Sequence, residues 1–302
     1  MRSFQVGLLL ITAQYGPDRV TARWSEIREL ALAAEAIGFD AVWTPDELLW
    51  REEGSPSQGY WEGISMAGAV AAVTSRIKVG TAVMAALHRN PGIIAKAAET
   101  LDEISGGRFV CGLGAGHAWP DQARTFGLPE DHIFARFEEA LEIIVPLLRG
   151  GRANFEGRWH AARDAAQLPV GPRPGQIPIM IGGNGPRAQR LAARHADIWS
   201  CYPEERSHVD EFAPRLASLD AICAELGRDP ASLGRSATVS VRPLQREEDP
   251  TGARIAGSAE AIAEALRTFR DAGYTQVEVM MTPVSIAAVE AMAPVLELLD
   301  AD

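Results

Sequence analysis

Residues 105–119, SGGRFVCGLGAGHAW, place an apolar run directly before alternating glycines. Glycines at this spacing allow a ligand to approach the backbone closely. A dinucleotide-binding turn has the pattern G-x-G-x-x-G, followed by an acidic residue about 20 positions on. Gly112 and Gly114 fit the first two positions, but His117 stands at the third, and the acidic partner is missing where a second strand should end. The stretch therefore argues against a dinucleotide fold.

A second glycine-rich stretch, IPIMIGGNGPR, ends in a turn before a helical pattern. Backbone N–H groups of Gly182, Gly183 and Gly185, together with the start of the helix, predict an anion site for a phosphate. Asn184 belongs to the same turn, and Arg187 adds a positive charge. The structural alternative for either glycine cluster is tight packing at a corner of a sheet.

The elements that must position these residues follow a regular pattern. Buried strands alternate with helices, and none of the main strands is joined to the next by a tight hairpin, which predicts one parallel (β/α)8 barrel. A doubly wound sheet is the alternative. Residues 150–176, rich in Arg, Gly and Pro, are expected as an insertion between strands 4 and 5, and residues 285–299 as a single final helix. The expected strands are FQVGLLL, FDAVWTPD, RIKVGTAVM, RFVCGLGAG, IPIMIGGNG, ADIWSCY, ATVSVRP and TQVEVMM.

Active sites of such barrels lie at the C-terminal ends of the strands. Both glycine clusters follow strands, at Gly112 and at Gly182, so we expect them at one face. Asp46 and Glu47 follow the second strand and reach the same face. Two glycine clusters at one face favour a phosphorylated planar cofactor.

Composition limits the partners. The 302-residue chain has 47% hydrophobic and 23% charged residues and a formal net charge of −11. This balance argues against general nucleic-acid or anionic-membrane binding, because either needs a basic face. Cys111, Cys201 and Cys223 have neither an even number nor metal-ligand spacing, so no disulfide framework and no metal site is expected. The first apolar run, 6–11, is too short for a signal peptide or a membrane span, and we expect a cytoplasmic protein.

Four stretches resemble a known family. They are LDEISGGRFVCGLGAGHAWPDQARTFGLP, RFEEALEIIVPLLRGGRANFEGRWH, PIMIGGNGPRAQRLAARHADIW and GSAEAIAEALRTFRDAGYTQVEV. They resemble the bacterial luciferase-like oxidoreductases that use a flavin or a deazaflavin, and the resemblance covers nearly the whole chain. It implies one barrel domain over 1–302, with the deazaflavin coenzyme F420 or FMN at the strand C-termini. The RNP helix start and the GGNGPR turn resemble the deazaflavin branch, which favours F420.

The resemblance also implies roles for single residues. Deazaflavin members often carry Asp-His after the second strand, where this chain has Asp46 and Glu47. Both are candidate catalytic residues, expected around the reactive ring with Trp50 and His117, and Glu47 is the candidate to replace the histidine as acid or base. His117 stands where the family usually has Trp, and it is a candidate for hydrogen bonding or proton transfer. The implied cofactor-binding residues are Trp50, Val83, Met84, Gly112, Gly114, Gly116, Gly182, Gly183, Asn184, Gly185 and Arg187.

Two classes of function stay open. In the first, the coenzyme moves a hydride to or from a small organic substrate while the protein supplies orientation and a proton; an FMN monooxygenase that uses molecular oxygen is the alternative enzyme. In the second, the protein binds a flavin or deazaflavin without catalysis, since Glu47 and His117 depart from the family pattern. Glu47 is then a solvated loop carboxylate and Trp50 a packing residue. A homodimer is expected.

Overall fold

The structure, a computed structural model, describes residues 4–15, 19–51, 57–116 and 120–301. Within these residues, eight parallel strands lie side by side, and the pairing of β9 with β12 closes them into a barrel. The predicted (β/α)8 architecture is confirmed. The barrel strands in order are β1 (Gln5–Leu9), β4 (Ala41–Thr44), β7 (Lys78–Thr81), β9 (Phe109–Gly114), β12 (Ile179–Gly182), β13 (Ile198–Cys201), β14 (Gly234–Arg242) and β16 (Gln276–Met281).

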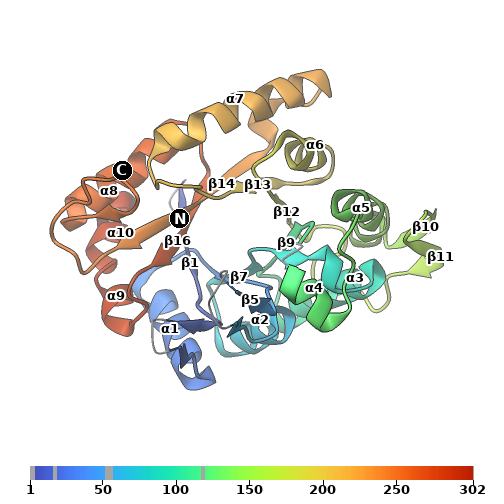
Figure 1. Cartoon of the computed structure of the whole chain (residues 1–302), viewed down its shortest axis with the longest axis horizontal. Helices are drawn as coiled ribbons and strands as arrows, with labels where there is room; N and C mark the ends of the chain where they lie inside the picture. The colour runs from blue at the N-terminus through green and yellow to red at the C-terminus, as the bar shows by residue number, and fades with distance from the viewer. Residues whose placement is uncertain (1–3, 16–18, 52–56, 117–119, 302) are drawn as a thin grey trace.

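Helices cover the outside of the barrel (Figure 1). In α3, the Asn90 side chain caps the first turn, Pro91 occupies that turn, and Gly106 ends the helix with a φ of 64°. Ile94 and Leu101 lie on its buried face, as the helical spacing predicts. The helices are α1 (Trp24–Ile37), α2 (Gly63–Val73), α3 (Pro91–Ser105), α4 (Pro120–Phe126), α5 (Ile133–Gly150), α6 (Pro186–His195), α7 (Val209–Glu225), α8 (Ala259–Asp271), α9 (Ile286–Glu290) and α10 (Ala293–Asp300).

The structure differs from the expected elements at two places. The predicted final helix is split into α9 and α10. Pro294 lies in the first turn of α10, and its ring would clash with the carbonyl of residue 290 in a continuous helix. The second difference is α4, a helix that the sequence analysis did not predict.

Residues 150–176 contain an antiparallel pair, β10 (Arg152–Glu156) and β11 (Ala161–Ala166). This hairpin projects beyond α5 at the right edge of Figure 1. That the segment is an insertion into the family's barrel stays a prediction. The remaining short elements are β2 (Gln14–Tyr15), β3 (Val20–Thr21), β5 (Leu49–Trp50), β6 (Gln58–Gly59), β8 (Met84–Ala85), β15 (Ile255–Ala256), and the 3₁₀ turns Ala86–His88 and Pro230–Ser232.

Trp43 on β4 fills part of the barrel interior. A Cβ on Gly7 would lie 2.2 Å from the Trp43 Nε1, and one on Gly80 would lie 2.2 Å from its Cζ3. The neighbouring strands β1 and β7 therefore need glycine at these positions, because any side chain would overlap the indole.

We expect Gly80→Ala to lower the free energy of unfolding by about 1–3 kcal/mol, the usual effect of overpacking a closed core. Urea unfolding of the variant and the parent measures this difference in the free energy of unfolding. Gly150→Ala is the matched control, because Gly150 ends α5 with no atom near its Cβ position, and alanine favours a helix. A Gly80→Ala variant as stable as the parent would show that the indole moves aside freely.

A polar cluster lies elsewhere among the strands. The Glu278 carboxylate on β16 accepts hydrogen bonds from Ser236 Oγ at 2.8 Å and from Thr238 Oγ1 at 2.7 Å. Burial raises the pKa of Glu278, although the hydroxyl groups around it act in the opposite direction. The carboxyl group therefore holds its proton to a higher pH than an exposed glutamate does.

No helix among the described residues is long and apolar enough to cross a membrane.

Candidate active site

The two glycine clusters lie at the same end of the barrel, as predicted. Strands β9 and β12 are parallel neighbours, and Leu113 is in register with Ile181. The next residues, Gly114 and Gly182, therefore end the two strands at one level, at the C-terminal face.

Val83 connects these two strand ends. It follows β7, and the Ala82–Val83 peptide bond is cis. A Cβ on Gly114 would lie 2.6 Å from Val83 Cγ2, and one on Gly182 would lie 3.1 Å from Val83 Cγ1. Both glycines thus make room for this one side chain. Val83 is only partly buried, which leaves part of it available to a ligand.

Other predicted contact residues are placed differently. The Met84 side chain is fully buried in the main hydrophobic core, so it does not face a ligand. A Cβ on Gly112 would lie 1.8 Å from the Thr81 carbonyl oxygen, so glycine is needed there for strand packing, the structural alternative. Gly116 has a φ of 90°, a conformation that favours glycine.

Asp46 follows β4 and is buried, with an exposed fraction of 2%. Its Oδ2 accepts a hydrogen bond from the Ala85 N–H at 3.0 Å, and the Arg89 guanidinium binds both carboxylate oxygens, at 2.5 and 2.8 Å. Burial opposes ionisation, but His88 and the paired Arg89 outweigh it and lower the pKa of Asp46 to about 2. Asp46 is therefore ionised at neutral pH and anchors residues 85–89.

Arg89 also holds α2 in place. Its second partner is Glu62, which caps α2 by accepting hydrogen bonds from the N–H groups of Ile64 and Ser65. Gly63 lies so close to Asp46 that a Cβ there would be 2.7 Å from Oδ1. A buried ion pair with this many partners ties the C-terminal end of β4 to α2 and to the segment after β7.

Glu47 belongs to a second polar set, centred on Gln122 of α4. The Gln122 Nε2 lies 3.1 Å from Glu47 Oε2 and 3.2 Å from His88 Nε2. Its Oε1 accepts from the N–H groups of Leu48 and Leu49, at 2.8 and 3.0 Å. His88 in turn has its Nδ1 3.7 Å from Asp46 Oδ2. The buried Gln122 amide thus connects the Glu47 carboxylate to the His88 imidazole, and the other nitrogen of that imidazole lies near Asp46.

A cavity of about 250 Å³ lies beside this set, between the segment after β1 and the segment after β6. Tyr60 lines it, and its N–H donates to the Leu48 carbonyl. Burial raises the pKa of Tyr60, and the charge of Glu47 adds to the effect. Thr12 also lines the cavity, and its buried hydroxyl has no hydrogen-bond partner among the described residues. Trp50, on β5, is half-buried and paired with Gln58.

The predicted phosphate turn differs from the expectation at Gly183 and Arg187. The Gly183 N–H already donates to the Ser200 carbonyl, at 2.9 Å, because β13 runs beside β12. The Arg187 guanidinium pairs with Glu138 of α5 through two contacts of 2.8 Å and is exposed. Neither group is therefore set to receive a phosphate.

Asn184 and Gly185 of the same turn are better placed than Gly183 and Arg187 to bind a phosphate. The Asn184 side chain exchanges hydrogen bonds with the Tyr202 backbone, and Gly185 caps α6 with open space around its Cβ position. Among the described residues, the backbone N–H groups of Asn184 and Gly185 have no acceptor. The N–H groups of this turn that could meet a phosphate are thus those of Asn184 and Gly185, whereas the predicted set began at Gly182.

His117 lies outside the described residues. The sequence analysis did not assign Arg89, Gln122 or His88 to the site. Arg89 and His88 follow the third strand, so the rule that sites lie at the strand C-termini was a usable signal for both. Gln122 had no such signal, because α4 was not expected.

Comparison with known proteins identifies relatives of this chain. The model of the luciferase-like monooxygenase family matches residues 4–250. An F420-dependent glucose-6-phosphate dehydrogenase of Nakamurella multipartita is 38% identical over 237 residues, which cover 69% of this chain and 63% of that protein. An F420-dependent hydroxymycolic acid dehydrogenase of Mycobacterium tuberculosis is 32% identical over 237 residues, covering 77% of this chain and 61% of that protein.

A solved structure extends the comparison to the whole fold. An F420-dependent secondary alcohol dehydrogenase in complex with an F420-acetone adduct superposes with a TM-score of 0.79 at 18% identity, over 99% of both chains. The matches to the two curated relatives span less than two thirds of their lengths. Since the family model matches the chain from before β1 to beyond β14 and includes every residue of the candidate site, the chain belongs to the luciferase-like monooxygenase family.

Proposed function

We propose that this chain is an F420-dependent oxidoreductase, which moves a hydride between F420 and a small hydroxylated organic substrate. The observation that carries the proposal is the set of Glu47, Gln122 and His88 beside ionised Asp46 at the C-terminal face. Relatives at 38% and 32% identity, both named as F420-dependent dehydrogenases, support the choice of coenzyme.

The residues present fit such a coenzyme. The glycines at the ends of β9 and β12 leave room for the partly exposed, apolar side chain of Val83, which suits contact with a flat ring. The N–H groups of Asn184 and Gly185 suit the phosphate, because they stand at the start of α6 without an acceptor among the described residues. Thr12 offers a buried hydroxyl without a partner in the neighbouring cavity.

Each polar residue then has a distinct task. F420, when bound, supplies the redox chemistry as the group that accepts or donates the hydride. Glu47 takes the hydroxyl proton as the alcohol is oxidised and returns it in the reverse reaction. Gln122 orients the Glu47 carboxylate and connects it to His88. Asp46, held by Arg89, stays ionised and positions residues 85–89 without exchanging a proton near neutral pH.

The test is to mix the protein with F420 and to follow the coenzyme's absorbance with glucose 6-phosphate, 2-propanol and a wider panel of alcohols and sugar phosphates. Reduction of F420 by a member of the panel without oxygen consumption is the expected result. Oxygen consumption with reduced FMN would support the monooxygenase alternative instead. Tight F420 binding without any reduction across the panel would support the non-catalytic binding protein.

The homodimer and the cytoplasmic location both stay predictions; sedimentation velocity tests the first, and fractionation of the source cells tests the second.

We expect Gln122→Glu to shift the pH profile of turnover. The new carboxylate keeps an acceptor for the N–H groups of Leu48 and Leu49, but it replaces a donor to Glu47 with a second negative charge about 3 Å away. Like charges this close do not ionise together, so the acidic limb of kcat/KM should move to higher pH by roughly 1 unit or more.

Gln189→Glu is the matched control, since Gln189 is a buried glutamine of α6 that bonds Arg215 and Ser218 away from the site. It should leave the profile where it is. A Gln122→Glu profile that coincides with the parent profile would mean that Glu47 does not carry the proton.

A further inference from the structure

A cavity of about 370 Å³ opens at the N-terminal end of the barrel, opposite the candidate active site. Gln5, Lys78, Ile198 and Gln276 line it, and each is the first residue of its strand. Its volume is in the range of small-molecule sites. Nothing in the proposed reaction uses this end of the barrel, so the cavity requires its own explanation.

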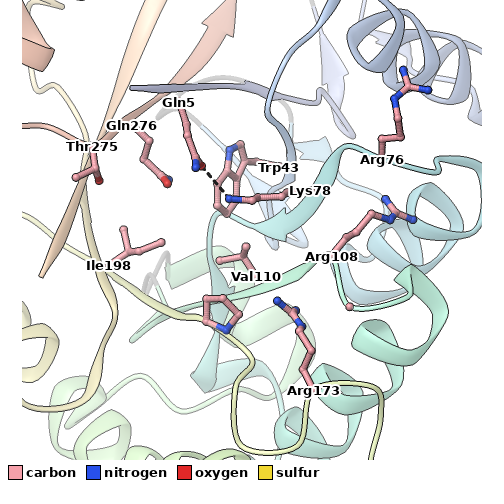
Figure 2. A pocket seen from close by; sticks show the side chains of 12 residues that line it. Gln5, Trp43, Arg76, Lys78, Arg108, Val110, Arg173, Ile198, Thr275 and Gln276 are labelled. Atoms are coloured by element: carbon pink, nitrogen blue, oxygen red, sulfur yellow. Dashed lines mark hydrogen bonds between the residues drawn. The ribbon is translucent and has the colours of Figure 1, made fainter. Parts of the chain in front are cut away.

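Four cationic side chains line this cavity, from Arg76, Lys78, Arg108 and Arg173 (Figure 2). Arg173 is paired with buried Asp102 and also donates to the Phe109 carbonyl. Its charge is therefore balanced within the protein.

Arg108 serves the structure of the rim. It donates to the carbonyls of Ala71, Thr74, Ser105 and Ile77, so its N–H groups hold the chain together. Glu35 is the carboxylate whose charge acts on it. Arg108 and Arg173 thus shape the cavity but have few donors left for a ligand.

Lys78 is different. Its Nζ donates to the neutral amide of Gln5 at 3.1 Å, and among the described residues no carboxylate lies within 4.0 Å of it. Burial lowers the pKa of Lys78; the charge of Asp40 acts in the opposite direction, and the charge of Arg173 lowers the pKa further. An ammonium held by one neutral amide retains two N–H donors for an anion.

The cations around the cavity differ in their partners. Asp102 pairs with Arg173, and the charge of Glu35 acts on Arg108, whereas Lys78 bonds the neutral amide of Gln5. An anionic group of a ligand would therefore pair with Lys78.

The inner wall of the cavity is apolar. Trp43, Val110, Pro178 and Ile198 line it. Figure 2 shows the end of the Lys78 side chain beside the Trp43 ring, with Ile198 and Gln276 on the opposite side. An indole face suits a flat apolar group. The cavity thus offers an apolar wall next to a single incompletely bonded ammonium.

We propose that this cavity binds a small organic monocarboxylate with a flat apolar body, whose carboxylate pairs with Lys78 and whose body lies against Trp43. This site is separate from the coenzyme site, and the proposal does not depend on the proposed function.

Calorimetric titration of the whole protein with 2-naphthoate tests it. We expect saturable binding to one site per chain, with the same affinity in the presence and absence of F420. Lys78→Met should weaken binding roughly 10- to 100-fold, since it removes a charge-assisted hydrogen bond. Lys78→Arg should retain most of the affinity, and 2-naphthamide should bind the parent at least tenfold more weakly than 2-naphthoate.

The matched control is Lys96→Met, since Lys96 lies on α3 and bonds the Leu168 carbonyl away from the cavity. It should bind 2-naphthoate like the parent. Thermal unfolding of Lys78→Met checks that the variant is folded, and Lys78→Arg gives an independent reading if it is not. Absence of binding to the parent, equal binding by Lys78→Met, or displacement of 2-naphthoate by F420 would each overturn the proposal.

Discussion

Glu47→Gln should slow turnover roughly 10²- to 10⁴-fold, the usual loss when a general acid or base is removed. Glutamine has nearly the same shape as glutamate, and its amide oxygen can still accept the hydrogen bond from Gln122 Nε2. The dissociation constant for F420 should therefore change less than threefold. Steady-state kinetics and a coenzyme titration on the same preparation separate the two effects.

The control for Glu47→Gln is Glu103→Gln, which changes an exposed carboxylate on α3. Its kcat should match the parent value. If Glu47→Gln also turns over at the parent rate, Glu47 is the solvated loop carboxylate of the alternative reading, and the proton must come from another group.

Asp46→Asn should destabilise the protein by about 3–5 kcal/mol, the range for breaking a buried ion pair by removing one partner. The asparagine oxygen can still accept a hydrogen bond from the Ala85 N–H. The Arg89 guanidinium, however, loses the negative charge of the carboxylate to which it donates two hydrogen bonds. The variant should also lose activity, because residues 85–89 and the start of α2 depend on this pair. Urea unfolding at neutral pH gives the free energy.

The same ion pair predicts a dependence on pH. Because the pKa of Asp46 falls from 3.8 to about 2 on folding, its contribution is complete above pH about 4 and is lost as the pH falls towards 2. Stability curves of the parent and of Asp46→Asn should therefore converge across this window. Glu156→Gln, which breaks an exposed pair with Arg163, should change stability by less than about 1 kcal/mol. Curves that stay parallel down to pH 2 would contradict the assignment.

The barrel was predictable because its strands are short apolar runs and its helices carry clear starts and stops. The strand after Arg108 and the helix Pro91–Ser105, which Gly106 ends, are good examples, since each is marked in the local sequence. Strand order in a barrel then follows from chain order, and so does the face on which Gly114 and Gly182 meet. Pro294, which separates α9 from α10, is equally a local signal, since proline disfavours a helix interior.

The candidate site was less predictable, because its contacts depend on neighbours that are distant in the chain. The Gly183 N–H donates to the carbonyl of Ser200, which belongs to the next strand. Arg187 pairs with Glu138, which belongs to another helix. Neither partner is marked by local spacing. The role of Gln122 depends on α4 reaching the segment after β4, a contact over more than 70 residues. Local pattern can identify a face of the barrel, but it does not show which groups there are already bonded.

A paired titration of the purified protein with F420 and with FMN asks whether the C-terminal face of this barrel is built for F420. Quenching of each coenzyme's fluorescence gives the two dissociation constants. We expect F420 to bind in the micromolar range or tighter, at least tenfold more tightly than FMN, which corresponds to about 1.4 kcal/mol. Equal or tighter binding of FMN, or no binding of F420, would contradict the account.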